Sequence, residues 1–163
     1  HLSDAQHKGG EAYAYRLRIS DPRPDFALRV APSRVVIRGK ESATVSVYAI
    51  RKDGFAGPIA FSLKGTNAGF AVQGATLTGT QTVARVTIKS TLNETEQPVP
   101  LVIQGTATNA PGTIIRDAVP AEDRMQAFLW RHLVPAQEFL AMVYDPKTVP
   151  DEPRQKKRFG KKK

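Results

Sequence analysis

Apolar and polar residues alternate in short runs through most of the first 118 residues of the chain. A period of two is typical of a strand with one buried face, because successive side chains point to opposite faces of a sheet. Turn signals such as Asp53-Gly54 interrupt the runs about every 8–12 residues. The pattern predicts an all-β fold, an antiparallel Ig-like or fibronectin III-like sandwich of about seven strands. The clearest runs are residues 26–30, 45–49, 59–63, 84–88 and 99–103.

An extra N-terminal strand is expected at residues 11–20, where Tyr13 and Tyr15 share the apolar face of an alternating run. The next residues, 21–25, read Asp-Pro-Arg-Pro-Asp, and two prolines so close together favour an extended linker over a strand. We therefore expect three parts. They are the terminal strand of a preceding domain with its linker (residues 1–23), the sandwich (24–145) and a disordered, flexible Pro- and Lys-rich tail (146–163).

The densest group of large apolar residues lies between residues 118 and 143. Side chains of this size are expected to be buried or to dock onto another surface. Residues 122–133 fit either an amphipathic helix or a bent strand, and Pro135 ends a helix in either case. Alternation at residues 139–143 predicts a closing strand. The candidate interaction residues are Phe128, Trp130, His132, Phe139, Tyr13 and Tyr15.

Composition limits the possible chemistry. A chain of 163 residues supports about one domain, and it has no apolar run of the length, about 18 residues, that a membrane span needs. Cysteine is absent, which removes disulfides, thiolate metal sites and cysteine nucleophiles. The net charge is +9, and most of it belongs to the last ten residues. Those residues form the candidate anion-binding set Arg154, Lys156, Lys157, Arg158, Lys161, Lys162 and Lys163.

No catalytic constellation is visible, and we expect neither an enzyme nor a bound cofactor or metal. The histidines His1, His7 and His132 lack the helical spacing of a metal motif, and no nucleophile turn of the GxSxG type occurs. The adjacent acids Glu122 and Asp123 would point to opposite faces of a strand, so they could not flank one glycosidic bond. His132 is expected to make a structural hydrogen bond.

Four short segments, residues 9–19, 24–28, 51–59 and 119–138, resemble in their order and spacing an Ig-like module of large secreted bacterial proteins that follows a pre-peptidase C-terminal (PPC) type domain. Residues 9–19 resemble the last strand of a PPC-type domain, and residues 24–28 resemble the start of the module that follows it. Residues 51–59 are similar to its middle hairpin, and residues 119–138 carry the most specific likeness. The resemblance implies an exported, multidomain, non-catalytic setting, either secreted, periplasmic or at the cell surface. The basic C-terminal segment departs from it.

The leading hypothesis is a structural or interaction module that acts in domain spacing, docking or assembly. Its partners would be neighbouring domains or other subunits, with strand exchange between copies as one route. A second hypothesis is a carbohydrate-binding module of a secreted hydrolase, which an exposed row of aromatic residues would support. A third is binding of anionic polymers by the basic tail. Its single aromatic residue, Phe159, offers little base stacking, so no specific nucleic-acid partner is expected.

Overall fold

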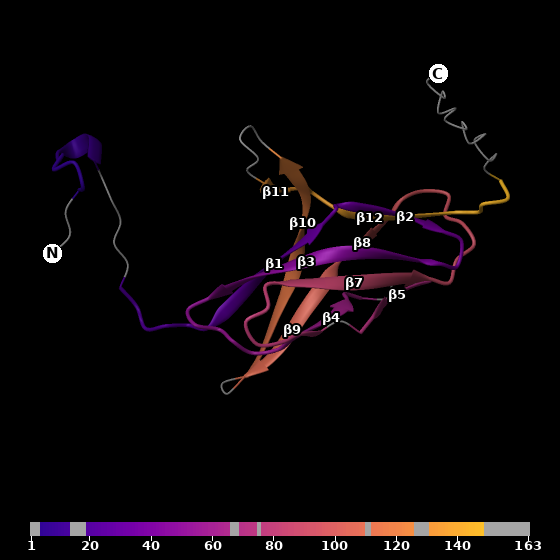
Figure 1. Ribbon diagram of the computed structural model, residues 1–163, viewed down its shortest axis with the longest axis horizontal. Helices are drawn as coiled ribbons and strands as arrows, with labels where there is room; N and C mark the ends of the chain where they lie inside the picture. Colours follow the sequence, from indigo (N-terminus) through magenta and orange to yellow (C-terminus); the bar gives the residue numbers. More distant parts are fainter. Residues whose placement is uncertain are drawn as a thin grey trace, which may run out of the picture.

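The computed structural model describes residues 4–13, 19–65, 69–74, 76–109, 112–125 and 131–148. Within them, the regular structure is one 3-10 turn, η1 (Glu11–Tyr13), and twelve strands (Figure 1). The strands are β1 (Asp25–Ala31), β2 (Arg34–Arg38), β3 (Ser42–Lys52), β4 (Ile59–Leu63), β5 (Phe70–Gln73), β6 (Thr76–Leu77), β7 (Val83–Ser90), β8 (Val99–Leu101), β9 (Ile103–Asn109), β10 (Gly112–Met125), β11 (Arg131–Pro135) and β12 (Phe139–Tyr144).

The strands form a large curled sheet, shaped like a half-barrel, and a small sheet of three strands. The large sheet has the order β5-β7-β3-β1-β10-β9-β4-β6, with β11 also paired to β10, and the small sheet has the order β2-β12-β8. Most neighbours are antiparallel, and β1–β10 and β2–β12 are parallel pairs. The all-β, mainly antiparallel class predicted from the alternation is therefore confirmed.

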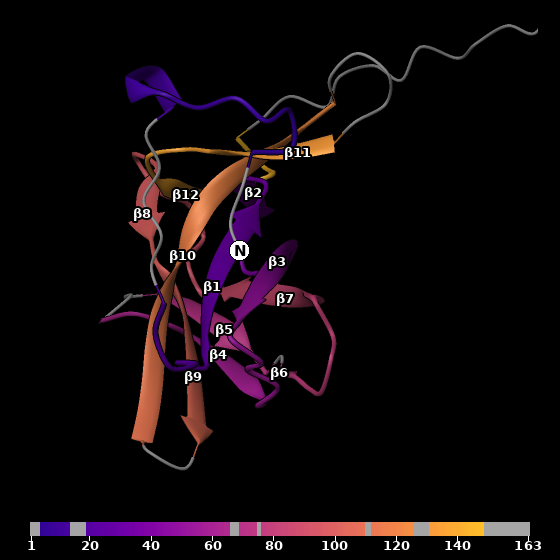
Figure 2. The same cartoon turned by 90° about the vertical axis from the view of Figure 1, so that its left-hand side faces the viewer.

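Strand β10 bridges the two halves of the large sheet. Its first part pairs with β9, its middle pairs in parallel with β1 through Leu28↔Ala118 and Val30↔Pro120, and its last part pairs with β11. Pro120 has no N–H to donate, but its carbonyl accepts a hydrogen bond from the N–H of Ala136 at 2.8 Å. Figure 2 shows β1 beside the middle of β10 and β9 beside its lower part. The parallel pair thus joins the two halves.

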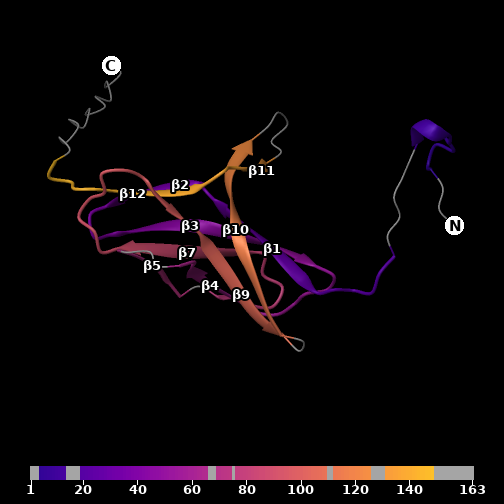
Figure 3. The same cartoon turned by 180° about the vertical axis from the view of Figure 1, so that it is seen from behind.

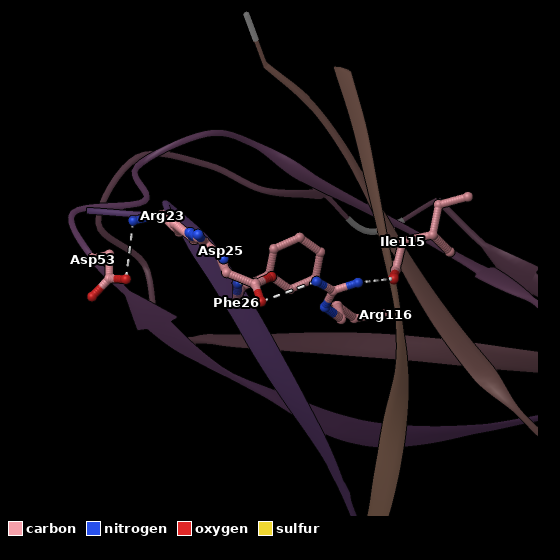
Figure 4. A network of polar contacts seen from close by, with 6 residues as sticks. All are labelled: Arg23, Asp25, Phe26, Asp53, Ile115 and Arg116. Atoms are coloured by element: carbon pink, nitrogen blue, oxygen red, sulfur yellow. Dashed lines mark hydrogen bonds and ion pairs between the residues drawn. The ribbon is translucent and has the colours of Figure 1, made fainter. Parts of the chain in front are cut away.

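A polar network joins β1 and β10 just before their paired residues (Figure 4). The Arg116 guanidinium donates from Nη2 to Asp25 Oδ2 at 3.0 Å and from Nη1 to the Ile115 carbonyl at 2.9 Å. The Arg116 hydrogen bond is the main reason that the pKa of Asp25 lies below its ordinary value. The backbone N–H of Arg23 donates to Asp53 Oδ2 at 3.1 Å, which ties the start of the sheet to the turn that follows β3.

The curled sheet closes over a core to which nearly every strand contributes. Phe26, Leu28 and Val30 of β1 are at most 1% exposed, and they pack with side chains of β3, β4, β7 and β9. Gly105 on β9 allows the closest approach across this core. A Cβ built there would lie 2.5 Å from Leu28 Cδ1 and 2.9 Å from Ile59 Cγ2.

The small sheet covers one end of this core, and β12 is its central strand (Figures 1 and 3). Phe139, Ala141 and Val143 point inward and are at most 2% exposed. Val35 and Ile37 of β2 join them in the same cluster. The closing strand predicted at residues 139–143 is confirmed.

Two local expectations are settled in part by the described residues. Of the two alternatives for residues 122–133, the described residues fit the bent strand and not the helix, because β10 runs to Met125 and β11 starts at Arg131. The predicted strand at residues 11–20 begins instead as the η1 turn, and the apolar Ile19 is 88% exposed. No described strand pairs with this segment, and a strand without a neighbour leaves its backbone groups and apolar face to solvent. Its residues 14–18, and the predicted tail from residue 149, lie outside the described ranges.

We expect Gly105→Ala to lower the free energy of unfolding by about 1–3 kcal/mol, because the added methyl would overpack a core without spare room. Urea denaturation would measure the change. Gly74→Ala is the matched control, since nothing lies within 4 Å of the Cβ built there. It should change stability by less than about 0.5 kcal/mol. Equal effects of the two substitutions would contradict close packing at Gly105.

Candidate interaction surface

A hairpin made by the end of β10 and by β11 extends beyond both sheets (Figures 1 and 3). Ala121 pairs with Pro135, and the register continues to Met125 opposite Arg131. The residues that connect the two strands, 126–130, read Gln-Ala-Phe-Leu-Trp and lie outside the described ranges. In the sequence, this apolar segment connects the two strands of the projecting hairpin.

Polar contacts hold the base of the hairpin against the β1–β2 corner. Glu122 Oε1 accepts a hydrogen bond from the Ser33 hydroxyl and another from the Ser33 backbone N–H at 3.4 Å. The Ser33 hydroxyl is the main cause of the lowered pKa of Glu122. From β1, Arg29 Nη1 donates to the carbonyl of Leu133 at 3.3 Å. These contacts tie both hairpin strands to the body of the sheet and fix the direction of the hairpin.

A shallow groove of about 380 Å³ lies beside the hairpin base, between β8, β10 and the start of β12. Its walls are mainly aliphatic, and Val119 and Val102 are 45% and 38% exposed. Carboxylates of Asp117 and Glu138 also line it. Apolar walls with a few polar groups are typical of a surface that binds another molecule.

The two carboxylates of the groove differ in their surroundings. Asp117 accepts hydrogen bonds from Lys64 Nζ at 2.6 Å and from Gln104 Nε2 at 2.9 Å, and the lysine contact is the first cause of its lowered pKa. Glu138 is exposed and has no ion-pair partner among the residues that the structure describes. The carboxylate of Asp117 is therefore already paired, while the carboxylate of Glu138 can accept a hydrogen bond from a bound molecule.

Exposed apolar side chains continue from the groove along the hairpin. Met125 is 65% exposed near the end of β10, and Val134 on β11 is 45% exposed. Val134 pairs with Glu122, so Met125, three residues further along β10, points to the opposite face of the hairpin. We call the four exposed side chains Met125, Val134, Val119 and Val102, which lie on the hairpin and at its base, the hairpin surface. The apolar side chains exposed on this projecting element are candidate contacts for another protein.

Three of the predicted interaction residues, Phe139, His132 and Tyr13, lie within the described ranges, and the structure places them in three different surroundings. Phe139 is 2% exposed and belongs to the core, so it supports the small sheet and offers no exposed contact. His132 is exposed on β11, opposite Arg124. Tyr13 is 53% exposed in η1, outside both sheets. Phe128, Trp130, Tyr15 and the seven basic tail residues lie outside the described ranges.

Sequence reasoning missed the groove and the contacts that hold the hairpin. Val119 lies on β10 and Val102 lies between β8 and β9, and Ser33 and Glu122 are 89 residues apart. Alternation along one strand carries no information about such pairs. One signal in the sequence was the pair Pro120 and Pro135. Proline is confined to strand positions whose N–H is not needed for pairing, so the two prolines mark where the strand pairing changes at the base of the hairpin.

No protein-family model matches the chain, and no curated protein matches it either. Among the described residues, no three acidic or histidine side chains are grouped to hold a metal ion. Likewise, no helix in the described part of the chain has the length and apolar character to cross a bilayer.

We expect Glu122→Gln to remove part of the pH dependence of stability. Because the pKa of Glu122 is lowered below 4.5, its contribution is present at neutral pH and is lost as pH falls through the folded-state pKa. Glu122 is only half-buried, so screening by solvent limits the effect to less than about 1 kcal/mol. Urea midpoints at pH 7 and pH 3, in protein and variant, would check it. If the difference in urea midpoint between protein and variant is the same at pH 7 and pH 3, the result would contradict the role of Glu122.

Proposed function

We propose that the chain is an Ig-like β-sandwich that works as a non-catalytic docking module of a secreted or surface-attached bacterial protein. The hairpin surface would bind a neighbouring domain or another subunit. The resemblance of residues 119–138 to modules that follow PPC-type domains supports the exported, multidomain setting. The work of the module would be to hold its partner at a defined place.

The observation that carries the proposal is the projecting hairpin with its exposed apolar residues. Met125 and Val134 are large, exposed and located on strands whose backbone is paired. A short hairpin exposes more surface than it buries, so a hairpin that serves only stability gains little from extending past the sheet. Its apolar content is better explained by a contact with another protein surface.

The hairpin is also held in one direction, which favours binding. The Ser33–Glu122 and Arg29–Leu133 hydrogen bonds restrain its base. Restraint before binding reduces the conformational entropy lost when the partner is engaged. The docking proposal is therefore supported both by the exposed residues and by the contacts that hold the hairpin in place.

The carbohydrate-binding alternative draws less support from the placement of the aromatic side chains. Sugar binding by stacking needs aromatic rings displayed on a surface. On the described strands, Phe26, Phe61, Phe70 and Phe139 are buried, and Tyr48 is only partly exposed. Within the described part of the chain, no sheet face presents a row of exposed aromatic rings. Docking to a protein remains the function that the geometry favours.

The proposal can be tested with a photo-crosslinking residue, p-benzoylphenylalanine, at Val134. In the full-length parent protein in its host, we expect Val134 to crosslink to another protein domain, because the hairpin surface would be covered there. Mass spectrometry would identify the linked peptides. Ile50 on β3 is a matched control site, since it is also an aliphatic strand residue and is 46% exposed against 45% for Val134.

Crosslinks from Val134 that exceed those from Ile50 by about tenfold would support a docking surface, whichever protein is the partner. Crosslinks of equal yield at the two sites, or none at Val134, would contradict it. Retention of the chain on insoluble polysaccharide, lost on substitution of Tyr48, would favour the carbohydrate-binding alternative instead.

A further inference from the structure

The outer face of the small sheet carries apolar side chains where an exposed sheet face is usually polar. Phe139, Ala141 and Val143 of β12 point into the core, and the residues between them face outward. Of these, Met142 is 39% exposed. It is directly opposite Val36 of β2, which is 65% exposed. The neighbouring outward residues of this face are Leu140, Tyr144 and Pro100.

The two edges of this face carry opposite charges. On the β2 edge, Arg34 and Arg38 are exposed. On the other edge, the segment around Thr95 lies against β12, since Thr95 N donates to the Val143 carbonyl at 2.9 Å and Val143 N donates to Thr95 Oγ1 at 3.0 Å. Glu94 and Glu96, on either side of Thr95, are exposed. The apolar centre is thus bordered by arginines on one side and by glutamates on the other.

Arg38 and Glu96 also lie at similar positions along the direction of β12. Arg38 pairs in register with Tyr144, and Thr95 contacts the adjacent Val143. Neither Arg38 nor Glu96 takes part in an ion pair among the residues that the structure describes. A rotation of 180° about an axis parallel to β12, lying in the outer face, would bring the arginine edge of one copy over the glutamate edge of another.

We propose that this face binds the same face of a second copy of the chain in a two-fold dimer. Val36 and Met142 would form its apolar centre, and Arg38 of each copy would pair with Glu96 of the other. A closed two-fold contact uses one surface patch on both subunits, so it must be self-complementary, and this face is. A purely anionic polymer or lipid surface would match the arginines and be repelled by the glutamates.

The dimer goes beyond the docking role, because it uses a different surface. The hairpin surface could bind its partner in a chain that stays monomeric, and the small sheet could pair in a chain whose hairpin binds nothing. Crosslinks from Val134 therefore report on docking alone. The association state of variants in the small sheet reports on the dimer alone.

Sedimentation velocity of the full chain over a range of concentrations tests the dimer. We expect a reversible monomer–dimer equilibrium that Val36→Arg weakens by about tenfold or more, because a buried charge would replace the apolar centre. A tenfold loss corresponds to about 1.4 kcal/mol. Val83→Arg is the matched control, since Val83 is an exposed valine of the large sheet, 45% exposed on β7. It should leave the equilibrium unchanged.

Charge reversal tests the pairing directly and leaves the apolar centre intact. Arg38→Glu and Glu96→Arg should each weaken the dimer by about threefold to tenfold, with a loss that shrinks in high salt. The double variant should regain most of the wild-type association, as should an equal mixture of the two single variants.

Three results would overturn the proposal. One is a chain that remains monomeric at every concentration. Another is a dimer that Val36→Arg leaves intact or that Val83→Arg weakens equally. The third is a charge-reversed double variant that associates no better than either single variant. Circular dichroism of each variant would show that the fold is retained before the association is compared.

Discussion

The structure depends on one strand, β10, and on its parallel pairing with β1. The two halves of the large sheet, β5-β7-β3-β1 and β10-β9-β4-β6, meet only at this pair in the strand order. The pairing is short, from Leu28↔Ala118 to Val30↔Pro120, and the Arg116–Asp25 ion pair reinforces its lower end. Without this junction, the inner faces of the two halves would not share the core that contains Phe26 and Leu28.

The length of β10 links the core to the surface. A single strand of 14 residues pairs with β9, then β1, then β11, so the direction of the hairpin follows from the twist of the sheet below it. The Ser33–Glu122 contact then adds a local restraint. The strand that carries part of the hairpin is therefore the same strand that joins the two halves of the large sheet. Its pairing within the sheet holds the base of the hairpin in place.

The small sheet shows how one strand can serve stability and recognition together. Strand β12 places Phe139, Ala141 and Val143 over the core and leaves Met142 outside. Its parallel pairing with β2 sets Met142 beside Val36, although the two residues are 106 positions apart. Removal of the inner residues would uncover the core, whereas changes to the outer ones would alter only the surface. The proposed docking and dimer contacts lie on different faces, so both could operate in one assembly.

The sequence by itself determined the all-β class, the Asp53-Gly54 turn and the closing strand, because these follow from local alternation and from residues that accept a positive φ, 49° and 76° in this turn. Only the tertiary structure decided that residues 122–125 and 131–133 lie on two paired strands, that Phe139 is buried and Tyr13 exposed, and which strands line the groove. Ser33 meets Glu122, and Val36 meets Met142, across about 90 or more residues of chain. Such contacts depend on strand order and register, which a periodic pattern along one chain does not encode.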